Sequence, residues 1–151
     1  MRNAVLPSCF FFFLLFSQCN SSKTLTGEVN YLTDSELGTV LVSAAGYGAS
    51  KSQAVSNAET NAFNTLIFNG IPGSQYRLPM VEASEKGKHK TYFYRLLDEQ
   101  GYKSFLMLSE PQTAFSGGRK NQKNILVKVK INVDGLRRDM EQAQVVRKFG
   151  L

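Results

Sequence analysis

The segment over residues 125–133 constrains the fold more than any other part of the chain. Every second residue in it is Ile or Val, while Lys128, Lys130 and Asn132 take positions between them. Because successive side chains of a strand point to opposite faces, this alternation predicts a strand with one buried face and one wet face. Such strands are typical of antiparallel sheets that are covered on one side only. We therefore expect the lysine-bearing face to lie outside.

A second segment predicts the helix that covers the buried face. Ser50 and Gln53 have the spacing of a capping box, which satisfies backbone N–H groups at the start of a helix. Behind them, small and apolar residues recur every fourth position and define one helix face. These residues are Ala54, Ala58, Ala62 and Leu66, with Val55 and Phe63 broadening the stripe. Asn69 and Gly70 should end the helix, because Pro72 prevents its continuation.

The Gly46-Tyr47-Gly48 sequence lies between this helix and a β-rich segment at residues 39–45, which predicts a strand. A Gly-x-Gly sequence here also occurs in dinucleotide-binding loops, but Lys51 replaces the third glycine of that motif. We therefore expect a tight turn that lets an alanine-faced helix pack closely. The residues assigned to this turn and to helix packing are Gly46, Gly48, Ala54, Ala58 and Ala62.

Shorter elements complete the predicted fold. Residues 71–87 contain prolines and glycines and predict an ordered loop. Residues 88–100 predict a short helix, or alternatively a strand through YFYRLL, and residues 102–108 predict a strand. After a loop at residues 111–124 and the alternating strand, Asp134 is the expected N-cap of a final helix. The inward residues of that helix are expected to be Leu136, Met140 and Ala143.

The N-terminus predicts export. Arg2 is followed by an apolar run at residues 5–16, and then by Cys19 and a polar stretch. As a helix, this run of about twelve residues would span roughly 18 Å, well short of a bilayer core of about 30 Å, which favours a signal peptide. A cysteine at this point resembles a bacterial lipoprotein signal, in which the cysteine is acylated, although Phe16 and Gln18 depart from the usual pattern. The alternative is simple cleavage near the same cysteine, which would leave a soluble protein.

Together these features predict a two-layer α+β fold, with a small, mainly antiparallel sheet and both the alanine-faced helix and the C-terminal helix on one side. Residues 1–18 are expected to be the signal peptide. Residues 19–38 are expected to be a lipid-anchored tether, or in part a first short element. Residues 39–151 then form a single α+β domain.

Composition limits the chemistry that such a domain can perform. Both cysteines, Cys9 and Cys19, precede the domain, so it contains no disulfide and no thiolate metal site. The chain has a single histidine, His89, so a histidine-based zinc site or a catalytic Ser-His or Cys-His pair is not expected. None of the acidic residues is singled out as a glycosidase-like pair. The sequence therefore predicts no catalytic residue, no metal and no cofactor.

Two segments also resemble a bacterial envelope group. They are VSAAGYGASKSQAVSNAETNAFNTLIFNGIPG and ILVKVKINVDGLRRDMEQ. The first is similar to the twenty-kilodalton membrane-associated lipoprotein family and to the N-terminal domain of flagellar assembly protein T. The ending VVRKFGL is similar to uncharacterised secreted proteins of Bacteroidetes-type bacteria. The resemblance covers residues 39–70 and 124–144. It implies a compact α+β fold in the envelope and, in some members, a part in assembling surface structures. It transfers no catalytic residue.

The net charge of +6 can indicate an anionic partner or only a soluble surface. One segment combines basic and aromatic side chains, a pattern that suits an anionic lipid or a cell-wall polymer but also a solvated face. Its candidate ligand residues are Lys86, Lys88, Lys90 and Arg95, interleaved with His89, Tyr92 and Tyr94. A second basic cluster is Arg119, Lys120 and Lys123.

These observations predict a non-enzymatic lipoprotein of the cell envelope, most plainly at the outer membrane, that serves as an interaction or assembly module. The membrane, through the lipid on Cys19, and an envelope protein are its expected partners, and nucleic acid is not. Its expected interaction surfaces are the free sheet edge and the basic segment. The alternatives are a secreted binding protein for an anionic glycan or lipid and, third, a hydrolase.

Overall fold

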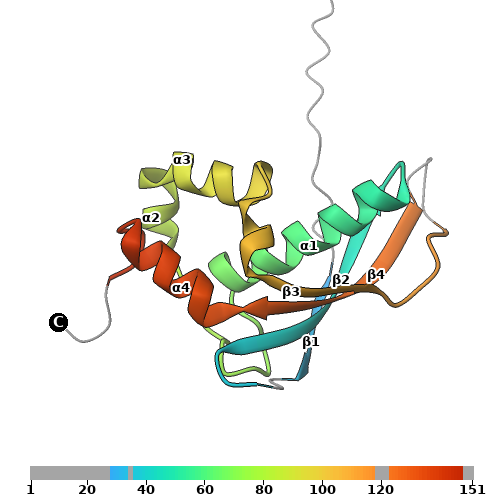
Figure 1. The fold of residues 1–151 in the computed structure, drawn as a ribbon, viewed down its shortest axis with the longest axis horizontal. Coiled ribbons are helices and arrows are strands. Elements are labelled where there is room, and N and C mark those ends of the chain that lie inside the picture. The colour runs from blue at the N-terminus through green and yellow to red at the C-terminus, as the bar shows by residue number, and fades with distance from the viewer. Residues whose placement is uncertain (1–27, 34–35, 118–122, 148–151) are drawn as a thin grey trace, which may run out of the picture.

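A four-stranded antiparallel sheet forms one layer of the protein, and the helices lie on one side of it (Figure 1). The computed structural model describes residues 28–33, 36–117 and 123–147. The strand order is β1-β2-β4-β3. The strands are β1 (Val29–Thr33), β2 (Thr39–Gly48), β3 (Leu106–Pro111) and β4 (Lys123–Asn132). The helices are α1 (Lys51–Phe68), α2 (Ala83–Lys88), α3 (Lys90–Phe93), the π-helix η1 (Tyr94–Asp98), the 3₁₀-helix η2 (Gly101–Phe105) and α4 (Val133–Gln142).

The two central strands carry most of the sheet's core. β2 and β4 pair along their whole length, from Thr39 opposite Asn132 to Gly48 opposite Lys123. The predicted alternation in β4 is confirmed, because its isoleucines and valines are buried while the residues between them are half-buried or exposed. The predicted α+β fold, with an antiparallel sheet and helices packed on it, is therefore confirmed.

Helix α1 lies across the buried face of the sheet, and its predicted apolar stripe is confirmed. Ser50 Oγ accepts a hydrogen bond from the Gln53 N–H at 3.2 Å, and Gln53 Oε1 accepts one from the Ala49 N–H at 2.9 Å. The capping box therefore forms, with Ala49 as the reciprocal donor. Asn69 ends the helix, and Gly70 follows with a φ of 74°, a left-handed conformation that suits glycine.

The predicted turn at Gly46 and Gly48 is wrong, although close packing there is right. Both glycines lie inside β2, where they pair with Ile125 and Lys123 of β4. A Cβ atom on Gly48 would lie 2.8 Å from the backbone nitrogen of Ala54, so only glycine leaves room for the helix at this point. The two glycines therefore let helix α1 pack closely against β2, and they do not form a turn after the strand.

The start of the domain also differs from the prediction. The segment assigned to a tether, residues 19–38, contains strand β1, which pairs antiparallel with β2. Its polar composition hid this strand, because β1 is an edge strand whose residues are half-buried or exposed. The domain therefore includes residues 29–33. For this part of the segment, the alternative prediction of a first short structural element is the correct one.

Three further elements differ from their predictions. The loop predicted at residues 71–87 contains the start of α2. The strand predicted at residues 102–108 begins only at Leu106, because η2 precedes it and buries Tyr102 against Phe63, with ring centroids 5.0 Å apart. The N-cap of α4 is Asn132, whose Oδ1 accepts from the Gly135 N–H at 2.8 Å, and not the predicted Asp134.

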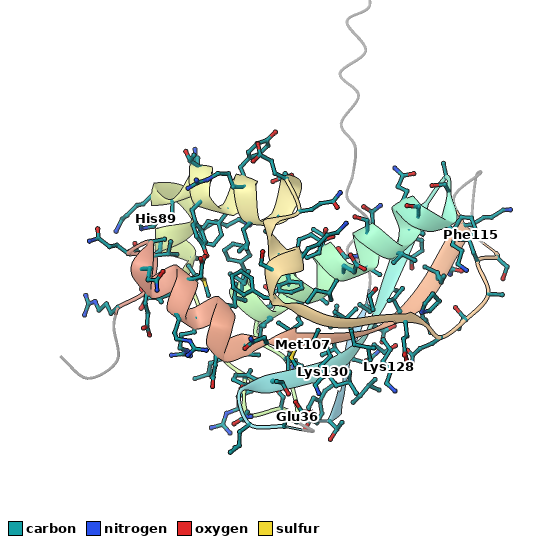
Figure 2. The ribbon with its side chains drawn as sticks, viewed as in Figure 1. Glu36, His89, Met107, Phe115, Lys128 and Lys130 are labelled. Carbon is teal, nitrogen blue, oxygen red and sulfur yellow. The ribbon has the colours of Figure 1, made fainter. Side chains whose placement is uncertain are left out.

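The outer face of the sheet carries the lysines of β4, as predicted (Figure 2). Lys130 Nζ lies 2.7 Å from Glu36 Oε1, and Glu110 of β3 is the register partner of Lys128. Both edge strands are irregular: β1 and β3 each contain a register shift, and β3 ends at Pro111. Bulges and proline are features that hinder the addition of a further strand at a sheet edge.

A second group of helices packs beside α1 and α4. The ring of Phe93 in α3 meets that of Phe68 in α1 edge-on, with centroids 4.9 Å apart. Leu96 of η1 and Leu136 and Met140 of α4 are buried in the same core. The predicted inward residues of α4 are thus confirmed for these two, whereas Ala143 is exposed and follows the helix as its C-cap. This packing sets η1 and η2 opposite α4.

The predicted signal peptide, the lipidation residue Cys19 and the tether up to residue 27 lie outside the described residues. Among the helices that the structure does describe, none has both the length and the apolar character required to cross a membrane.

Candidate functional site

The predicted basic residues lie on three helices that follow one another along the chain. Lys86 and Lys88 belong to α2, Lys90 to α3 and Arg95 to η1. The Lys86 ammonium lies 4.2 Å from the centre of the Phe68 ring, in a cation–π contact. Lys88 Nζ lies 2.7 Å from Glu85 Oε1. These two lysines therefore have partners within the protein.

Glu85 holds a small charge cluster at the start of the basic segment. Its Oε2 lies 3.6 Å from Nε2 of His89, and the hydrogen bond from Lys88 lowers the pKa of its carboxyl below the usual range. The side chain of Lys88 is exposed and that of Glu85 is half-buried, so solvent screens this pair and it contributes little to stability. His89 is half-buried in this cluster rather than a lone surface residue.

Arg95 differs from the lysines, because it lines a cavity between η1, η2 and α4. The cavity has a volume of about 650 Å³. Its walls are formed by Tyr92, Arg95, Leu96, Gly101, Ser104, Phe105, Asp139, Gln142 and Ala143. The Arg95 side chain is exposed, and its guanidinium forms no hydrogen bond or ion pair with any described residue. An unpaired guanidinium on a cavity wall, beside apolar side chains, is suited to bind an anionic group.

A short hydrogen bond joins two other residues that line this cavity. The Tyr92 hydroxyl donates to Asp139 Oδ2 at 2.6 Å, joining α3 to α4. Burial, and then this bond to a carboxylate, raise the pKa of Tyr92 far above its ordinary value, while the charge of Arg95 opposes the rise. Tyr92 therefore keeps its proton at neutral pH and acts as a donor. The bond leaves Asp139 Oδ1 without a side-chain partner among the described residues.

The backbone that presents Arg95 is unusual. Residues Tyr94–Asp98 form a π-helix, closed by a hydrogen bond from the Glu99 N–H to the Tyr94 carbonyl at 3.1 Å. Gln100 then adopts a left-handed conformation with φ of 61°. π-helices are rare and occur often at functional sites, and non-glycine residues with positive φ are uncommon. The sequence predicted a helix here but gave no sign of either feature.

A buried carboxylate that the sequence did not single out lies on α1. Glu59 is 6% exposed. Its Oε1 accepts from Ser109 Oγ at 2.5 Å, and its Oε2 accepts from the Tyr102 hydroxyl at 3.1 Å. The signal was its position between Val55 and Phe63 at four-residue spacing, on the covered side of the helix. Because its bonds join α1 to η2 and β3, we assign Glu59 a structural role.

Another cavity, of about 860 Å³, lies between residues 80–85 and the end of α4. Its wall carries three carboxylates, from Glu82, Glu85 and Glu141, and the guanidiniums of Arg137 and Arg147. Glu85 is already bonded to the neighbouring cations, and Arg137 also has an interaction within the protein. Because Glu85 and Arg137 are already engaged within the protein, this cavity offers a ligand fewer available charges than its lining suggests.

The other predicted features give no competing site. Arg119 and Lys120 of the second basic cluster lie outside the described residues, and the Lys123 ammonium lies 5.5 Å from the centre of the Phe115 ring. Within residues 28–33, 36–117 and 123–147, no three acidic, histidine or cysteine side chains are grouped so that they could hold a metal ion.

Comparisons of the chain with protein-family models, with curated proteins and with solved structures found no match. The resemblance to envelope lipoproteins and to the N-terminal domain of flagellar assembly protein T therefore stays a prediction.

Proposed function

We propose that this protein is an exported, lipid-anchored envelope module that binds an anionic group of an envelope component in the cavity beside Arg95. The observation that carries the proposal is the guanidinium of Arg95, which lines this cavity and has no ion pair of its own among the described residues. A planar guanidinium offers paired donors to a carboxylate or a phosphate, and Leu96 and Phe105 supply apolar contact beside it.

The chemistry of the cavity favours binding over catalysis. Its most perturbed group is Tyr92, and the raised pKa keeps this phenol protonated rather than available as a base. Asp139 accepts the phenol proton in a hydrogen bond and is positioned by it. A non-enzymatic interaction module is therefore the function that these side chains support best.

Anchoring rests on the sequence. Cys19 follows an apolar run too short to span a bilayer and precedes a polar stretch, as in bacterial lipoprotein signals. Mass spectrometry of the mature N-terminus tests this part of the proposal. We expect an acylated cysteine at position 19 in the native protein and no lipid in Cys19→Ala. An unmodified terminus in the native protein overturns lipid anchoring and favours simple cleavage.

Binding is tested with the full-length protein in detergent. We expect the protein to be retained on an immobilised carboxylated polysaccharide or on vesicles of anionic lipid more strongly than on their neutral counterparts. Arg95→Gln should abolish the difference, whereas Lys90→Gln should leave it unchanged. Lys90 is the matched control, because it is an exposed cation on the neighbouring helix that does not line the cavity. Equal retention of Arg95→Gln and the native protein overturns the proposal.

A further inference from the structure

We infer that the cavity between η1, η2 and α4 takes a small zwitterion, an apolar α-amino acid with a free carboxylate and a free ammonium group. This inference rests on the proposed function, because the carboxylate of the ligand is the anionic group that Arg95 would bind. It adds a second recognition element, Asp139, and with it the class of ligand.

The cavity holds two opposite charges that do not neutralise each other. Arg95 comes from η1 and Asp139 from α4, and both line the same cavity. The ion pairs of the described residues do not include this pair. Both charges nevertheless act on the hydroxyl of Tyr92, Asp139 through a hydrogen bond and Arg95 through its field. They are therefore near each other but available to a third molecule.

Each charged group has hydrogen-bonding capacity left for a ligand. All five N–H donors of the Arg95 guanidinium are free of partners among the described residues. Asp139 uses Oδ2 to accept from Tyr92, which leaves Oδ1 to accept from an ammonium group. Tyr92 holds the carboxylate in place, so the acceptor is positioned before any ligand arrives.

Electrostatics then selects among ligand classes. A simple anion is attracted by Arg95 but loses part of that attraction to repulsion by Asp139, and a simple cation beside Asp139 is opposed in the same way by Arg95. A zwitterion presents the opposite sign to each group and avoids both repulsions. Leu96, which is 5% exposed, and Phe105 provide apolar surface for a side chain. The volume of about 650 Å³ lies within the range of known small-molecule sites.

The local backbone supports a built site. Gly101 also lines the cavity, and a Cβ atom there would lie 2.9 Å from the Arg95 carbonyl oxygen and 3.3 Å from the Leu96 Cα. Glycine at this position lets η2 pack against the π-helix. The π-helix and the left-handed residue before η2 together fix the wall from which Arg95 extends.

Isothermal titration calorimetry of the full-length protein in detergent tests the inference with three probes. Leucine carries both charges, N-acetyl-leucine lacks the ammonium group, and leucine methyl ester lacks the carboxylate. We expect leucine to bind about tenfold or more tightly than either blocked form, since each loses one charge pair. Lys90→Gln is again the matched control and should bind leucine as the native protein does.

Two variants separate the contributions of the two charges. Arg95→Gln should weaken both leucine and N-acetyl-leucine. Asp139→Asn should weaken leucine but strengthen N-acetyl-leucine, because the repulsion of the bare carboxylate is removed. The stronger binding of N-acetyl-leucine also shows that Asp139→Asn is folded. Tyr92→Phe, which keeps both charges, should retain the preference for leucine.

The outcomes distinguish this inference from the proposed function. If N-acetyl-leucine binds the native protein as tightly as leucine and depends on Arg95, the zwitterion is wrong and anion binding stands. If none of the three probes binds at millimolar concentration while retention on anionic polymer or vesicles still depends on Arg95, the inference is overturned and the proposed function stands. If retention on anionic polymer or vesicles is also independent of Arg95, both the inference and the proposed function are overturned.

Discussion

Gly46 of β2 lies directly against Ala58 of α1: a Cβ atom added to the glycine would come within 2.6 Å of the alanine's backbone nitrogen and 2.8 Å of its Cβ. The added atom would also overlap the Ala54 carbonyl oxygen, which is the nearest atom to it, so the strand and the helix can touch here only because Gly46 has no side chain. The layer of helices is held at this distance from the sheet along the alanine stripe.

We therefore expect Gly46→Ala to lower the free energy of unfolding by about 1–3 kcal/mol, because the added methyl group forces strand and helix apart. Urea denaturation followed by circular dichroism measures this change. Gly87→Ala is the matched control, since an added Cβ there meets nothing within 4 Å. That control lies in α2 and should be neutral or stabilising by up to about 1 kcal/mol. Equal effects of the two substitutions would contradict the packing argument.

The N-cap of α4 gives a second test. Asn132 Oδ1 accepts from the Gly135 N–H, so Asn132→Ala should lower the free energy of unfolding by about 1 kcal/mol. Asp134 lies in the first turn and acts only through its charge, so Asp134→Asn should lower it by about 0.3–1 kcal/mol and less than the cap variant. Salt should diminish only the second effect. The reverse order of the two variants would restore Asp134 as the cap.

The buried carboxylate of Glu59 predicts energetic coupling between α1 and β3. Glu59→Ala leaves the Ser109 hydroxyl without its acceptor and removes one of the partners of the Tyr102 hydroxyl, which Ser56 also contacts, and should lower the free energy of unfolding by about 1–3 kcal/mol. Ser109→Ala should matter less in the Glu59→Ala background than in the native protein, with a coupling of about 0.5–3 kcal/mol. Ser84→Ala, on the exposed side of α2, should combine additively with Glu59→Ala. Additivity for the Ser109 pair would show that the hydrogen bond contributes nothing.

Alkaline pH should weaken the fold through Tyr102. Burial raises the pKa of this phenol above its ordinary value of about 10. The folded protein therefore keeps a proton that the unfolded chain releases, so the contribution of Tyr102 is complete below about pH 10 and declines as the pH rises above it. Denaturation at increasing pH should show the stability difference between native protein and Tyr102→Phe shrinking above about pH 10. A difference that grows there would contradict the sign of this linkage.

Several features of the fold were predictable because they depend on neighbours in the sequence. The alternation of β4, the alanine stripe of α1 and its capping residues follow from the period of strands and helices and from the needs of a helix end. The sequence also predicted that Gly46 allows close helix packing, although it wrongly placed this glycine in a turn.

Features that depend on distant partners were not predictable in the same way. Strand β1 has little apolar surface and exists because β2 offers it hydrogen bonds. Residues 101–105 form the 3₁₀-helix η2 where the sequence predicted the start of a strand, because Tyr102 contacts Phe63 and Glu59 on α1.

The sequence by itself determined the α+β class, the layer that buries its apolar residues and the presence of a basic segment. Only the tertiary structure decided which basic residue faces a cavity. Lys86 and Lys88 have partners within the protein, whereas Arg95, on a π-helix, lines the same cavity as Asp139. The reason is that Tyr92 and Asp139 are 47 residues apart. Their contact depends on how α3 and α4 pack, and no local pattern records that packing.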